Sequence, residues 1–107
     1  MNQTSRAAVI VEHLGGEKFL ATLGARDFAM DDSSFGFTFV HDNPRGVHSV
    51  VVLVEPHGGF KVICYGRIAP GTFHAPMLGS ESVAIAESLA AVLGKLTGID
   101  AFKHRHL

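Results

Sequence analysis

Seven histidines are the residues of this chain that could most readily act as general bases or metal ligands. They stand at positions 13, 41, 48, 57, 74, 104 and 106. His57 precedes two glycines in a turn, and His74 lies in a loop containing proline and glycine, where functional groups are commonly presented. The sequence offers neither of them a preorganised partner. We therefore expect both to be turn residues, and they mark the site of one alternative, a small enzyme or ligand-binding protein.

Two sets of possible metal ligands occur along the chain. His41, Asp42 and His48 flank one predicted turn, and His104 and His106 form an H-x-H pair near the end. Zinc needs three or four ligands converging at about 2.0 to 2.3 Å. Neither set supplies enough, and the H-E-x-x-H pattern is absent. The sequence thus predicts no metal and no cofactor.

Cys64 is the single cysteine and could be a nucleophile if a neighbouring group lowered its pKa. It falls inside a predicted strand, alternating with Val62 on the face that carries Phe60 and Ile68. That position is typical of a buried, unreactive thiol. We expect no catalytic residue and a protein that is not an enzyme.

The segment Gly15-Gly16-Glu17-Lys18 opens a predicted helix and could cradle a phosphate. The P-loop pattern and a preceding strand are missing. Two adjacent glycines are also what a sharp elbow between two helices requires. Gly15, Gly16 and Lys18 are therefore assigned to the elbow, with ligand binding as the alternative.

Four residues share one face of the predicted strand 60–68, namely Lys61, Ile63, Tyr65 and Arg67. Three of them, Lys61, Tyr65 and Arg67, could form a weak nucleic-acid surface together with Arg45. Nine Lys and Arg against ten Asp and Glu give a net charge of -1, which argues against counterion release as a driving force. We interpret these four residues as a protein-interaction surface.

The elements that would position these residues follow from the apolar pattern. With 107 residues, 47% of them hydrophobic, the chain fits a single domain spanning 1–107. Helices are predicted from Thr4 or Ser5 to Leu14, over 17–23 and over 81–96, and strands over 35–40, 47–54 and 60–68, with a loop over 69–79. The predicted fold is α+β, in the order helix, helix, three strands, helix. The strands form a three-stranded antiparallel sheet, and the long C-terminal helix packs on it.

The middle predicted strand is apolar on both sides. Val50, Val52 and Val54 point one way, while Val47, Val51 and Leu53 point the other. Either the helices divide between the two faces or another chain covers the free one. We expect a homodimer through the sheet, with Ile63 and Tyr65 near its centre and Lys61 and Arg67 at its rim.

The start of the chain is polar, and the apolar run 7–11 is too short for a signal peptide or a membrane span. The sequence therefore predicts a cytoplasmic protein that makes no membrane contact. An unpaired cysteine agrees with a reducing compartment.

The opening Leu14-Gly15-Gly16-Glu17-Lys18-Phe19, followed by Gly24-Ala25 and Phe28, resembles a family of small uncharacterised phage and prophage proteins with an L-G-G-x-K-F, then G-A-x-x-F, signature. The likeness continues in Phe35, Phe37 and Phe39 and in the final Leu96-Thr97-Gly98. It implies a phage or mobile-element origin and carries no known activity. The leading hypothesis is a protein that acts by protein contact, for example against a host defence or regulatory component.

Overall fold

Helices open and close the described part of the chain, residues 6–68 and 70–102 of a computed structural model, and five strands lie between them. In chain order the elements are α1 (Arg6–His13), α2 (Gly16–Thr22), β1 (Ala25–Met30), β2 (Ser34–Phe39), β3 (Ser49–Val54), β4 (Phe60–Tyr65), β5 (Met77–Val83), the 3-10 turn η1 (Ala86–Ser88), α3 (Leu89–Thr97) and the 3-10 turn η2 (Asp100–Phe102).

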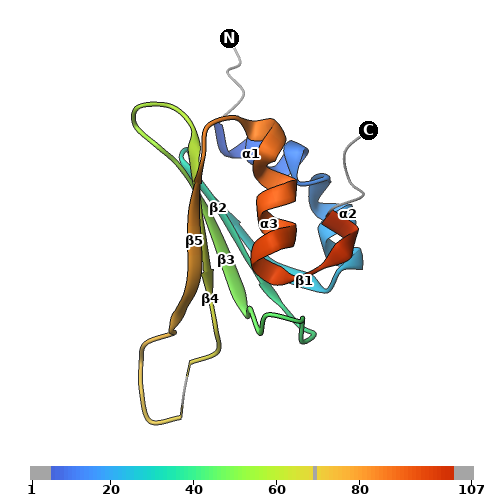
Figure 1. Ribbon diagram of the computed structural model, residues 1–107, viewed down its shortest axis with the longest axis vertical. Helices are drawn as coiled ribbons and strands as arrows, with labels where there is room; N and C mark the ends of the chain where they lie inside the picture. Colours follow the sequence, from blue (N-terminus) through green and yellow to red (C-terminus); the bar gives the residue numbers. More distant parts are fainter. Residues whose placement is uncertain (1–5, 69, 103–107) are drawn as a thin grey trace.

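The five strands form one antiparallel sheet in the order β1-β2-β3-β4-β5, so each strand pairs with its neighbour in the sequence. All the helices lie on one side of this sheet (Figure 1). α1 contacts β2 and β3, α2 contacts β1, and α3 contacts β4 and β5. The described residues therefore form two layers, and none of their helices lies over the other face of the sheet (Figure 1). No helix in the ranges 6–68 and 70–102 is both long and apolar enough to cross a bilayer.

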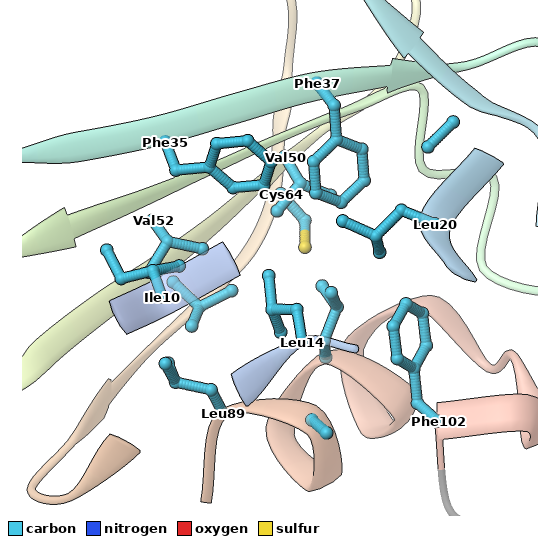
Figure 2. Close-up of a cluster of buried hydrophobic side chains, with 14 of the residues drawn as sticks. Ile10, Leu14, Leu20, Phe35, Phe37, Val50, Val52, Cys64, Leu89 and Phe102 are labelled. Carbon is cyan, nitrogen blue, oxygen red and sulfur yellow. The ribbon is translucent and has the colours of Figure 1, made fainter. Parts of the chain in front are cut away.

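The core lies between the sheet and the helices. Phe35, Phe37 and Phe39 point from β2 toward the helices, and their neighbouring ring centroids are 5.7 and 5.3 Å apart. Figure 2 shows side chains of β2, β3 and β4 facing side chains of the helices across this layer. The fully buried residues that close the core from the helical side are Ile10, Leu14, Leu20, Leu89, Leu93 and Phe102.

The α+β class is confirmed, but the predicted three-stranded sheet is wrong because the sheet has five strands. The three expected strands form β2, β3 and β4, and β4 ends at Tyr65 instead of residue 68. β1 was missed because its pattern is irregular. Its register with β2 shifts between Arg26 and Ala29, and Asp27 has a φ of 58°. A bulge of this kind removes the period-two alternation that identifies a strand.

The long C-terminal helix over 81–96 is also wrong. β5 occupies the first part of that range, and only the three-residue turn η1 and the nine-residue helix α3 follow. Ser80 resembles a helix cap, and Val83 and Ile85 extend the apparent apolar stripe of α3. Ile85 is instead 57% exposed. The predicted loop 69–79 accordingly ends at Met77, where β5 begins, and it connects two adjacent strands.

The burial of α3 gives a direct test of the corrected fold. Leu89→Ala should lower the free energy of unfolding by about 2 to 5 kcal/mol, because Leu89 is fully buried and its truncation leaves a cavity. Ile85→Ala is the matched control and should cost less than about 0.5 kcal/mol, since that side chain is exposed. Urea denaturation of both variants measures these values. Equal losses would mean that both residues lie on one buried helix, as the sequence pattern suggested.

Candidate functional site

The face of the sheet opposite the helices is covered by no helix in the described part of the chain (Figure 1). Cross-strand partners share a face, so the register identifies its residues. We call the following set the open face: Ser34, Gly36 and Thr38 of β2, Ser49, Val51 and Leu53 of β3, Lys61, Ile63 and Tyr65 of β4, and Met77, Ser80 and Ser82 of β5.

Apolar side chains occupy the middle of the open face. Val51 lies directly opposite Ile63, and Ser49 lies opposite Tyr65. Ile63 is only 9% exposed, because its neighbours on β3 and β5 flank it. Met77, paired with Tyr65, is 58% exposed. The open face thus combines a compact apolar centre with an exposed methionine at the sheet edge.

Residues with short side chains border this centre on two sides. Gly36 and Thr38 border it on the β2 side, and Ser80 and Ser82 border it on the β5 side. Because these side chains do not project beyond the apolar centre, another flat surface could approach the centre closely.

Three of the four predicted interaction residues, Lys61, Ile63 and Tyr65, lie together on β4 and on the open face. Arg67 lies beyond the end of β4, and its guanidinium is 3.6 Å from a carboxylate oxygen of Asp42. Both of these side chains are well exposed, so this ion pair contributes little to stability.

The candidate histidines are not brought together. His57 lies in the turn between β3 and β4, and His74 lies in the loop between β4 and β5. The six residues of β4 separate these connections by about 20 Å. A hollow of about 180 Å³ beside the first turn is lined by apolar residues and glycines, namely Val9, Val54, Gly58, Gly59 and Phe60. That lining offers no ionisable group to assist His57.

The predicted glycine elbow joins α1 to α2. Gly15 and Gly16 have φ angles of 108° and 88°, values that favour glycine. Lys18 is exposed on α2, which has only seven residues. The elbow therefore has a conformational reason for both glycines that requires no ligand.

The possible metal ligands do not converge in the described part of the chain. Among residues 6–68 and 70–102, no three His, Cys, Asp or Glu side chains are grouped to hold a metal ion. His104 and His106 lie outside the described residues.

A groove between β5 and α3 was not anticipated from the sequence. Its larger part has a volume of about 590 Å³ and is lined in part by Val83, Ile85, Ala91 and Val92. A second hollow of about 310 Å³ is lined by Arg45, Leu78, Lys95 and Leu96. Lys95 lines both hollows, which makes them neighbours along the strand. The groove could have been found only by recognising 77–83 as a strand.

Cys64 is buried in the core, and desolvation raises the pKa of its thiol to about 11. The thiolate is the reactive form, so at pH 8 the native protein should react with a disulfide reagent at least about 100-fold more slowly than the denatured chain. Stopped-flow measurement of thiol release checks this. Fast reaction of the native protein would show that Cys64 is accessible.

The raised pKa of Cys64 also makes the stability of the fold depend on pH. Because the pKa in the folded state lies above the unfolded value, the stability associated with the neutral thiol is complete below about pH 9 and falls as the pH rises toward 11.

Comparison of the chain with protein-family models, curated sequences and solved structures yields no match. The functional argument therefore depends on the surfaces of this molecule.

Proposed function

We propose that this protein acts by protein contact and that it associates with a second copy of itself through the open face. The observation that carries the proposal is the placement of every described helix on the same side of the sheet (Figure 1). The apolar residues on the other side, including Val51, Leu53 and Tyr65, consequently have no layer over them. Apolar surface is stabilised by removal from water, and a sheet packs well against another sheet.

A second copy fits this surface because the open face is self-complementary in charge. Across β2 to β5, the two central rows of the face, one through Val51 and Ile63 and one through Ser49 and Tyr65, contain no charged side chain. Arg26 ends the second row, on the edge strand β1. A two-fold axis through them brings identical patches together without opposing like charges. Lys61 lies in the next row and would be placed toward the rim, where water can solvate its ammonium group.

Protein contact also agrees better with the arrangement of candidate groups than catalysis does. His57 and His74 belong to opposite ends of β4, and burial keeps the Cys64 thiol protonated. We extend the proposal to the phage or mobile-element setting that the resemblance implies, with a host defence or regulatory protein as the partner of the dimer. A nucleic-acid role would need cations on the open face, and Arg67 is already paired with Asp42.

Tyr65→Glu tests the dimer. We expect light scattering across a concentration series to give twice 11.4 kDa for the unchanged protein and 11.4 kDa for the variant, because a carboxylate at the centre of the contact would be desolvated without a partner. The melting curve of the variant should remain cooperative, since Tyr65 lies on the open face and not in the helix-covered core.

Ala21→Glu is the matched control, because Ala21 is exposed on α2 on the helical side of the molecule. It should leave the dimer intact. A mass of 11.4 kDa at every concentration for the unchanged protein would contradict the proposal.

A further inference from the structure

We propose that the outer edge of β5, together with the groove between β5 and α3, binds an extended peptide segment. The peptide adds to the sheet as a sixth, antiparallel strand. It carries an apolar residue over the larger part of the groove and an acidic residue four positions later, near Arg45 and Lys95. Strand addition of this kind takes its affinity from backbone hydrogen bonds and its specificity from side-chain pockets.

The backbone pairing identifies which groups of β5 are free. The Val54 N–H donates to the carbonyl of Ser33 on the β2 side, and the Glu55 N–H donates to the carbonyl of Gly59 across the β3–β4 turn. Backbone groups alternate in direction along an antiparallel strand. Val54 therefore directs its backbone groups toward β2, and Leu53 directs its groups toward β4.

The strand register extends this alternation of backbone direction from β3 through β4 to the edge strand β5. Leu53 is paired with Lys61, so Lys61 directs its backbone toward β3 and Val62 directs its backbone toward β5. Val62 faces Glu81. Ser80 and Ser82, the neighbours of Glu81, consequently direct their N–H and C=O groups away from the sheet. β5 is the last strand of the sheet order, so no strand of the described ranges pairs with these groups and they form an open edge.

The groove beside this edge can accept a side chain. Its volume of about 590 Å³ is within the usual range for small ligand sites, and Val83, Ile85, Ala91 and Val92 give it apolar walls. Ile85 is 57% exposed, which leaves apolar surface available for contact. An apolar side chain of the added strand would therefore be partly removed from water here.

The other end of the groove is positively charged. Arg45 and Lys95 both line the smaller hollow. Lys95 has a partner in Glu81, whose carboxylate lies 2.5 Å from the ammonium group. Arg45 is held near the end of α3 by its backbone N–H, which donates to the Thr97 carbonyl at 3.2 Å. The net charge of these three side chains is positive, so an acidic residue of the peptide is favoured there.

The spacing of the two residues follows from strand geometry. Val83, at the apolar end, and Gly79, next to Leu78 at the basic end, are four residues apart, or about 13 Å. The N-terminal part of an antiparallel peptide lies beside Val83, and its C-terminal part lies beside Gly79. Residues four apart on a strand share a face, so the apolar residue precedes the acidic residue by four positions.

A second copy of β5 fits this edge less well than such a peptide. The register of β5 shifts near its start, so Met77 pairs with Tyr65 on the open face while Glu81 pairs with Val62 on the helical face. An apolar and an acidic residue four apart are thus present in β5 but point to opposite faces. Glu81 is also already paired with Lys95.

The probe is the peptide Thr-Thr-Leu-Thr-Thr-Thr-Glu-Thr-Thr, blocked at both ends, titrated into isotope-labelled protein and followed by nuclear magnetic resonance. We expect the amide signals of Ser80 and Ser82 to shift and to gain protection from hydrogen exchange. The control peptide has leucine and glutamate exchanged, which keeps its composition. It should bind about 5-fold more weakly or worse, because it loses at least one ion pair of about 1 kcal/mol.

Two protein variants separate the parts of the site. Arg45→Gln should weaken the glutamate peptide about 5-fold and leave a glutamine version of the same peptide unaffected. Ala91→Trp should abolish binding by filling the groove, whereas Ala21→Trp on α2 should not, since both alanines are exposed.

The proposal is overturned if millimolar peptide leaves the Ser80 and Ser82 amides unchanged, if the exchanged peptide binds equally well, or if shifts appear only on the open face. It is also overturned if these amides are protected in the free protein and Ser80→Pro lowers its mass, because a second copy would then occupy the edge. The site does not depend on the proposed dimer, so the monomeric Tyr65→Glu variant should bind the peptide with unchanged affinity.

Discussion

The row of phenylalanines on β2 determines which face of the sheet the helices cover. Phe35, Phe37 and Phe39 are almost fully buried and all point to one side. Large aromatic side chains contribute most when they are fully removed from water, so the helices lie on the side of the sheet to which this row points. α1 contacts β2 itself, while α2 contacts β1 and α3 contacts β4 and β5. Because α1, α2 and α3 all lie on one face, no element between residues 6 and 102 that the structure describes covers the opposite face (Figure 1).

The two edge strands of the sheet differ in regularity. β1 is interrupted by a bulge, whereas β5 keeps backbone groups that can accept another strand. At the β1 edge, a bulge with Asp27 at a φ of 58° interrupts the strand, and α2 contacts it. Bulges and charged residues are common means of blunting an edge. β5 has a regular register from Gly79 to Val83. Of the two edge strands, β5 therefore offers the regular backbone on which a further strand could form hydrogen bonds.

The parts of the fold that could be predicted from sequence are those with a strong local pattern. The alternation of β2 and the valine run of β3 identified both strands, and the parity of β4 correctly placed Lys61, Ile63 and Tyr65 on one face. β5 could not be recognised, because an edge strand needs few apolar residues and Gly79, Ser80 and Ser82 conceal it. The groove depends on the tertiary approach of α3 to β5, which local periodicity does not encode.

The ion pair between Glu81 and Lys95 explains how an open edge and a specific peptide site can coexist. Glu81 faces the helical side of β5, where a regular sheet would place an apolar residue. A charge pointing inward on an edge strand disfavours indiscriminate sheet extension, because an incoming strand would desolvate it. Lys95 compensates that charge from α3 and brings a cation to the groove. An incoming strand with an acidic residue at the right position would share the cations there, while an apolar strand would bury the pair. The same two side chains thus link α3 to the edge and select what the edge accepts.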